Sequence, residues 1–239
     1  MTEPALDPNY DPLVDGPVRK GGDRRVRPRD AATLIIVRRD APKPRLLMGR
    51  RNAGHDFMPD KWVFPGGRID RSDFRAPYAA DLRPEVAARL VKTARPARAR
   101  AIAMSAIRET FEEAGLLLAK PATPRPGAGP WRDFLELGAE ADLSALDFVA
   151  RAITPPYRPK RFDARFFVAE ADRLMSLERR PDCGELDEIA WVDLDEALAL
   201  DLPNITRFVV QEVALRLEAP DRPAPFMRFL RGARHLTHL

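Results

Sequence analysis

The sequence predicts an α+β fold in which a mixed β-sheet lies between layers of helices, an α/β/α sandwich. Segments typical of strands and of helices are interspersed along the 239 residues without a regular βαβ alternation, and no internal repeat is present. Hydrophobic residues make up 45% of the chain, which is enough for one globular domain with a sizeable core.

Strands are expected first, because apolar runs near the start of the ordered chain are bounded by turn residues. They span 31–39, 44–51 and 61–67, and the third ends in Pro65-Gly66-Gly67. Two helices follow: one over 84–94 with proline in its first turn, and one over 99–114 closed by Gly115 in the left-handed conformation. Beyond a Pro/Gly-rich linker at 120–130, we expect strands at 146–154, 165–170 and 188–194 and helical segments at 194–200 and 205–218.

Composition narrows the domain organisation and the class of protein. Residues 1–28 are rich in Pro, Asp, Gly and Arg without apolar periodicity, which is typical of a flexible N-terminal arm, so a single domain is expected over 29–239. A single cysteine and three histidines favour oxygen ligands over a zinc site, if a metal is bound. With no apolar stretch of about 18 residues and no secretory leader, we expect a cytoplasmic protein without a membrane partner.

The net charge of +4 suits a polyanionic partner. A phosphorylated small molecule and a nucleic acid both fit this charge, but no helix-turn-helix, zinc module or aromatic RNA-binding motif supports a nucleic acid. Whether the chain forms a homodimer stays open.

The segment RETFEEAGLLL, residues 108–118, places Glu109, Glu112 and Glu113 within five positions at the end of the second expected helix. Carboxylates near a helix C-terminus oppose its dipole by ~0.3–1 kcal/mol each, and like charges three or four residues apart add a few tenths. A hard divalent cation such as Mg²⁺ would offset this cost. A solvated acidic face neutralised by neighbouring arginines is the alternative.

These acids, together with the upstream FPGG, resemble the Nudix box, G-x5-E-x7-R-E-U-x-E-E-x-G-U with U aliphatic. Its first half opens at Gly67, and six positions later stands Asp73 instead of Glu, one methylene shorter, which leaves the usual contact to the arginine open. The family spacing places that arginine at position 81, but it stands at 108, so the box contains 27 additional residues, at about 74–100. The second half is filled in register by Arg108, Glu109, Glu112, Glu113, Gly115 and Leu116, with Thr110 at a usually aliphatic position.

The resemblance covers about residues 31–200 and implies a Nudix-type α/β/α sandwich. It also implies Mg²⁺- or Mn²⁺-dependent hydrolysis of the diphosphate in a nucleoside diphosphate linked to another moiety X. A catalytically silent Nudix-fold module that binds a nucleotide or regulates a partner is the alternative.

The resemblance also implies roles for single residues. Glu112 and Glu113 would ligate the metal with the Gly66 carbonyl, and Glu109 would be a further ligand or the base that activates water. Arg108 would orient a carboxylate through a salt bridge. A later loop offers Glu185 as a further acid, with a solvated turn as the alternative.

An insertion inside the box is similar to that of the peroxisomal coenzyme A diphosphatases. This similarity places coenzyme A or acyl-coenzyme A ahead of a nucleotide sugar, ADP-ribose or a dinucleoside polyphosphate as substrate. We expect the insertion to form a helical excursion beside the site, and Phe162, Phe166 and Phe167 to pack in the core. Candidate phosphate-binding residues, which could also be ordinary surface cations, are Arg50, Arg51, Lys160 and Arg161.

Overall fold

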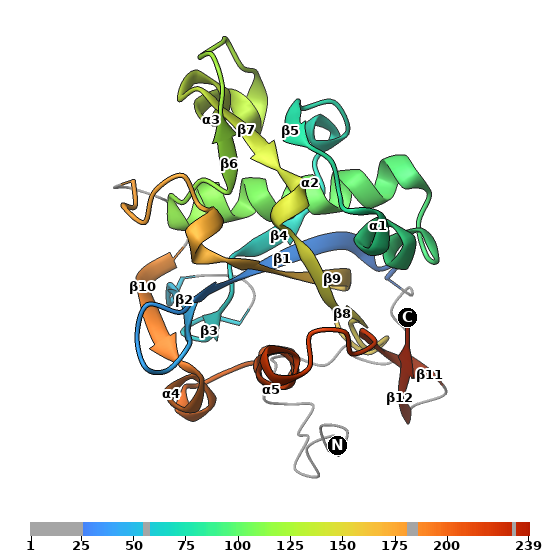
Figure 1. The fold of residues 1–239 in the computed structure, drawn as a ribbon. Coiled ribbons are helices and arrows are strands. Elements are labelled where there is room, and N and C mark those ends of the chain that lie inside the picture. The colour runs from blue at the N-terminus through green and yellow to red at the C-terminus, as the bar shows by residue number, and fades with distance from the viewer. Residues whose placement is uncertain (1–25, 55–57, 181–185, 231–232) are drawn as a thin grey trace.

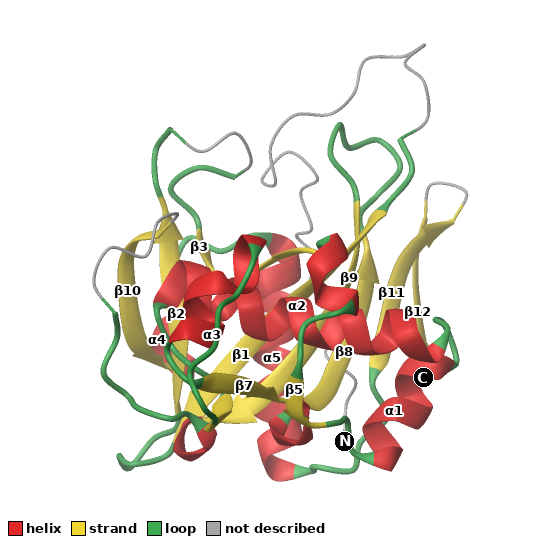
Figure 2. Cartoon of the chain, turned by 90° about the horizontal axis from the view of Figure 1, so that it is seen from above, coloured by secondary structure: helices red, strands yellow, loops and turns green. Residues whose placement is uncertain are grey.

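The computed structural model describes residues 26–54, 58–180, 186–230 and 233–239, and these form the expected α/β/α sandwich. Helices α1 and α2 cover one face of a central sheet, and α4 and α5 cover the opposite face (Figure 1); Figure 2 looks onto the face that α2 covers. The predicted N-terminal arm lies outside the described residues as far as residue 25. The helices are α1 (Pro84–Val91), α2 (Pro96–Ala114), α3 (Arg132–Glu136), α4 (Leu194–Ala199) and α5 (Asn204–Glu218).

The central sheet is mixed, as predicted. Within the described residues it contains nine strands, in the order β10-β2-β1-β9-β8-β11-β12, with β3 paired to β2 and β4 paired to β1. The β1–β9 and β8–β11 pairs are parallel, whereas the other pairs are antiparallel. The strands are β1 (Arg29–Arg38), β2 (Arg45–Arg51), β3 (Trp62–Val63), β4 (Gly66–Arg68), β8 (Asp147–Ile153), β9 (Phe162–Glu170), β10 (Leu186–Asp193), β11 (Pro225–Leu230) and β12 (Ala233–His238).

Strand alternation divides the hydrophobic core into two layers. On β1, Leu34 and Ile36 are fully buried and pack in the cluster that contains the apolar residues of α2. Ile35 and Val37 point the opposite way and pack in the cluster that contains α5. Because side chains alternate between the faces of a strand, each face of β1 supplies one of the two layers.

Helix α2 carries the RETFEEAG segment and follows the predicted boundaries closely. It starts at Pro96, three residues before the expected start, because a proline is tolerated at the first helical position. It ends at Ala114, and the next residue, Gly115, has a φ of 69° and forms the left-handed cap predicted from sequence. Thr110, at the usually aliphatic position, is fully buried, and its hydroxyl donates to the Ala106 carbonyl at 2.8 Å.

Several short strands were not predicted. The Gly66-Gly67 segment, expected as the irregular end of a strand, is the paired strand β4, and the hairpin of β11 and β12 follows α5. The predicted linker at 120–130 begins inside a strand of a small second sheet, ordered β5 (Tyr78–Ala80), β7 (Ala139–Asp142) and β6 (Ala119–Pro121). The box insertion is therefore not wholly helical, because it contains β5 as well as α1. No helix in the described part of the chain is both long and apolar enough to cross a membrane.

Candidate active site

Arg108 lies at the centre of the candidate site, held by a buried carboxylate. Its Nε donates to Asp73 Oδ1 at 2.9 Å and its Nη2 to Asp73 Oδ2 at 3.1 Å, and both residues are almost completely buried. Asp73 also accepts from the Trp131 indole N–H at 2.9 Å and from the Asp70 amide at 2.7 Å. The shorter Asp73 therefore does reach the arginine, and a tryptophan from beyond the box shares in holding it.

Arg108 uses its remaining donors to fix the acidic side chains of the same helix. Its Nη1 donates to Glu109 Oε1 at 2.9 Å and to Glu112 Oε2 at 2.7 Å, and its Nη2 donates to the Arg68 carbonyl at 2.8 Å. Glu112 is the more accessible of the two acids, with 36% of its side chain exposed against 16% for Glu109. One guanidinium thus positions two carboxylates and the end of β4 together.

The two glycines of β4 let the backbone of this strand approach the acids closely. A Cβ placed on Gly67 would overlap the carboxylate of Glu109, so no larger residue fits there without moving that group. The Gly66 amide donates to Glu113 Oε2 at 2.9 Å, and Glu113 is almost fully buried. The two halves of the box, separated by the insertion in sequence, meet at this strand.

Burial dominates the electrostatics of the acids. It raises the pKa of Glu109 to about 7, although the nearby Arg108 guanidinium acts in the opposite direction. Burial likewise raises the pKa of Glu112 above its ordinary value. Burial lowers the pKa of Arg108, but the hydrogen bond with Asp73 and the charges of the acids outweigh it and hold that pKa above the ordinary value. Arg108 stays charged, while Glu109 can exchange a proton near neutral pH.

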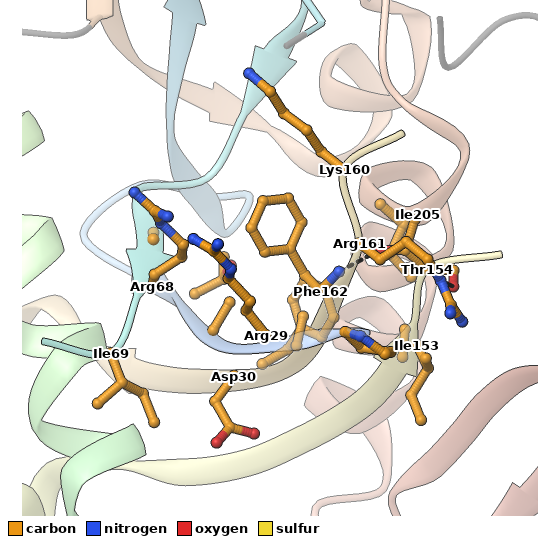
Figure 3. A pocket seen from close by; sticks show the side chains of 18 of the residues that line it. Arg29, Asp30, Arg68, Ile69, Ile153, Thr154, Lys160, Arg161, Phe162 and Ile205 are labelled. Carbon is orange, nitrogen blue, oxygen red and sulfur yellow. Dashed lines mark hydrogen bonds between the residues drawn. The ribbon is translucent and has the colours of Figure 1, made fainter. Parts of the chain in front are cut away.

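The acids open onto a cleft of about 1360 Å³. Its wall includes the three glutamates, the first turn of α5 and the ends of β1, β4 and β9, and Figure 3 shows the side chains of several strand-end residues pointing into it. A cleft of this size accommodates a ligand larger than a mononucleotide.

The structure separates the four predicted phosphate-binding cations. Arg51 and Lys160 line the cleft, but Arg50 does not, and its Nε lies 3.6 Å from Glu188 Oε2 on β10. Arg161 also lines the cleft, yet it is buried and donates to the Thr154 and Val26 carbonyls at 3.0 and 2.8 Å. Arg50 therefore lies against another strand and outside the cleft, and Arg161 joins backbone segments, which leaves Arg51 and Lys160 as the candidates for phosphate binding that we retain.

The predicted metal ligands fit a hard cation by their chemistry and by their position on one helix. The described residues contain no closed group of three His, Cys, Asp or Glu side chains around one point. Mg²⁺ needs no such cage, because it is usually held by one or two carboxylates together with water and substrate phosphate oxygens. Glu185, the further acid predicted from the later loop, lies outside the described residues.

Two sets of residues at the site were not found from sequence. Trp131 lies just after the predicted linker, and nothing local indicated that its indole would reach Asp73. Phe162, expected in the core, is half-buried and lines the cleft, whereas Phe166 and Phe167 are buried as predicted. Arg29 in β1 pairs with Phe162 in β9, and this pairing places both residues at the wall of the cleft.

A three-layered α/β/α sandwich whose R-E-x-x-E-E helix is fixed against a glycine loop defines the Nudix class of proteins. No family model matches the sequence. A solved NUDIX hydrolase of Alicyclobacillus acidocaldarius superposes with a TM-score of 0.60 and 28% identity, over 79% of this chain and 92% of that one.

Curated relatives agree with this class. The acyl-coenzyme A diphosphatase NUDT19 of Gallus gallus is 29% identical over 78% of this chain, and that of Homo sapiens is 30% identical over 52%. The chain spans 65% and 47% of the lengths of these two proteins. This chain is therefore similar to Nudix hydrolases and resembles these coenzyme A diphosphatases.

Proposed function

We propose that this chain is a metal-dependent hydrolase that cleaves the diphosphate bond of a nucleoside diphosphate linked to another moiety. The observation that supports it most is the buried Asp73–Arg108 pair, which holds Glu109 and Glu112 at the wall of a large cleft. A structural helix gains nothing from crowding carboxylates at its C-terminal end, where they oppose the dipole. A divalent cation that binds between these carboxylates and the phosphates of a substrate would offset this cost.

In the proposed reaction, Glu109 is the general base. Its pKa of about 7 lets it take the proton of a water molecule near neutral pH. The water oxygen forms a new bond to phosphorus as the bridging phosphorus–oxygen bond breaks, and the departing phosphate leaves with the bridging oxygen. Arg108 bonds Oε1 of Glu109 and so fixes the orientation of the carboxylate that receives the proton.

Glu112 and Glu113, with the Gly66 carbonyl, are the residues that would hold Mg²⁺ or Mn²⁺. When bound, such an ion neutralises diphosphate oxygens and lowers the pKa of bound water. The pinning of Glu112 by Arg108, and of Glu113 by the Gly66 amide, restricts both carboxylates before any ligand arrives.

We propose coenzyme A or an acyl-coenzyme A as the substrate. The names of the relatives from Gallus gallus and Homo sapiens support this choice. The volume of the cleft is compatible with a ligand that has phosphate beyond its diphosphate, and so are Arg51 and Lys160, two of the three predicted cations that line it.

Hydrolysis can be tested by incubating the chain with coenzyme A, acetyl-coenzyme A, ADP-ribose and NADH, with Mg²⁺ or with EDTA, and resolving the products by ³¹P NMR. We expect Mg²⁺-dependent cleavage, with coenzyme A species preferred. Glu112→Gln should lower kcat at least a hundredfold, whereas the matched change Glu136→Gln, at an exposed position of α3, should leave it unchanged. Cleavage that persists in EDTA, or normal turnover by Glu112→Gln, would contradict the proposal. Nucleotide binding without any cleavage would instead identify a catalytically silent module.

A further inference from the structure

The face of the sheet that packs on α5 carries a row of three alanines across three adjacent strands. Ala31 of β1 pairs with Ala164 of β9, and Ala164 pairs with Ala152 of β8. Paired residues point to the same face, and all three alanines line the cleft. Since neighbouring strands lie about 4.8 Å apart, the row is about 10 Å wide. No side chain longer than a methyl group rises from it, so it is a flat floor, named here the alanine platform.

Aromatic side chains border this platform along β9. Phe162 and Phe166 stand two residues before and after Ala164 and therefore point to the same face. Phe166 is largely buried, while Phe162 is half-buried and its ring projects into the cleft (Figure 3). A small residue between two aromatic ones on a strand leaves a notch that suits a flat, aromatic group.

Two arginines stand at one end of the alanine platform. Arg68 of β4 pairs with Ala31, and Arg29 lies two residues before Ala31 on β1, so both side chains rise from the same face. Figure 3 shows the two side chains extending to the same side as Phe162, whereas that of Asp30 points away.

Asp30, the acidic residue between Arg29 and Ala31, forms ion pairs with other arginines. Asp30 binds Arg98 at 2.5 Å and Arg165 at 2.8 Å. Within the described part of the chain, no side-chain hydrogen bond or ion pair neutralises Arg29 or Arg68. Adjacent guanidinium groups repel each other, and their planar donors match phosphate oxygens, so this end of the platform favours a phosphate group.

The short strand β4 connects the arginine pair to the acids. Gly67 faces Glu109, and the next residue, Arg68, faces the opposite side because side chains alternate along a strand. The carbonyl of Arg68 is itself held by Arg108 at 2.8 Å. Although they face opposite sides of β4, Arg68 and the three glutamates line the same cleft, so one substrate can reach from a phosphate on Arg68 to the acidic cluster.

We propose that the alanine platform binds the nucleoside half of the substrate, with a purine base over Ala31, Ala164 and Ala152 and a ribose phosphate on Arg29 and Arg68. This inference rests on the proposed function and specifies which half of the substrate lies on which residues. An uncharged acyl or pantetheine arm offers no anionic partner for Arg29 and Arg68, whereas a nucleotide combines a flat base with a phosphate.

The test measures binding to the whole chain in EDTA, by calorimetry, with adenosine 3′,5′-bisphosphate, AMP and pantetheine as probes. We expect the bisphosphate to bind more tightly than AMP, and Ala164→Leu to weaken both nucleotides at least tenfold by filling the notch. Because Ala164 is half-buried and lines the cleft, the added atoms extend into open space rather than into the core. The pair Arg29→Gln and Arg68→Gln, combined in one variant, should weaken the bisphosphate at least tenfold.

Two matched controls keep the outcome interpretable: Ala88→Leu on the exposed side of α1 and Arg132→Gln on α3 should bind like the unchanged chain. If the unchanged chain binds neither nucleotide, the proposal for the alanine platform is wrong. It is also wrong if Ala164→Leu and the double arginine variant bind the nucleotides as tightly as the unchanged chain. The proposal is wrong as well if Ala164→Leu weakens the binding of pantetheine and leaves the binding of the nucleotides unchanged. None of these measurements involves turnover, so a protein that binds nucleotide on the platform but cleaves nothing refutes the proposed function alone.

Discussion

Replacing Trp131 by Phe should weaken the buried network that positions the acids. The change removes the indole N–H that donates to Asp73 Oδ1 at 2.9 Å. It keeps an aromatic ring at a position that packs edge-on against Phe134, with ring centroids 5.0 Å apart. The Asp73 carboxylate is 2% exposed, so water cannot replace the missing donor.

The expected size of the effect follows from these contacts. A hydrogen bond to a charged group contributes about 1.5–3 kcal/mol, and Asp73 retains its bonds to Arg108 and to the Asp70 amide. We therefore expect the free energy of unfolding to fall by about 2 kcal/mol. For a chain of this size, this corresponds to a decrease in Tm of roughly 4–8 °C.

Urea unfolding followed by circular dichroism, without metal, measures this free energy. Trp191→Phe is the matched control, because Trp191 lies on β10 with Arg38 over its ring and takes no part in the network. Adding Asp73→Glu to Trp131→Phe should restore part of the loss, since the longer side chain can reach Arg108 with less support. If Trp131→Phe loses no more stability than Trp191→Phe, the indole does not hold Asp73 as described.

Three further predictions follow from the same geometry. In EDTA, stability should fall by up to about 3 kcal/mol as pH rises from 4.5 towards 7, because the Glu109 pKa of about 7 in the folded state exceeds its unfolded value of 4.5. The charge of Arg108 lowers the pKa of Glu109, whereas the charge of Glu112 raises it further. In urea unfolding, the free energy of unfolding of Glu109→Gln should change less with pH than that of the unchanged chain. An equally steep pH dependence would contradict the raised pKa of Glu109. Gly67→Ala should lower kcat at least tenfold, because the added methyl group displaces Glu109. The control Gly54→Ala should leave turnover unchanged, since the nearest atom lies 3.6 Å from the added methyl group. Similar rates for the two variants would argue against the close approach of Gly67 to Glu109. Arg51→Gln should raise KM for coenzyme A several-fold and Arg50→Gln should not, so equal kinetics in the two variants would remove Arg51 from the proposed binding surface.

Helix α2 shows what local sequence can predict. Its apolar periodicity, its first-turn proline and the left-handed Gly115 act within a few residues, and each predicted its structural counterpart within three residues. The Nudix box likewise predicted the fold, because the spacing from Arg108 to Gly115 is contained in one helix. The short strands were harder to predict, since β4 and β6 have three residues each and exist through the partners that they pair with.

The sequence by itself determined the resemblance to the Nudix family, the acidic helix and the order of the main elements, all of which depend on neighbouring residues. Only the tertiary structure decided which distant side chains support the acids, because those contacts cross long stretches of chain. Arg108 binds Asp73 from 35 residues away, and Trp131 reaches Asp73 across 58 residues. The register of β4, β1, β9 and β8 likewise aligned Arg68 with three alanines that no sequence spacing connects. Sheet pairing is set by the packing of whole strands between two helical layers, and this packing is a property of the folded chain.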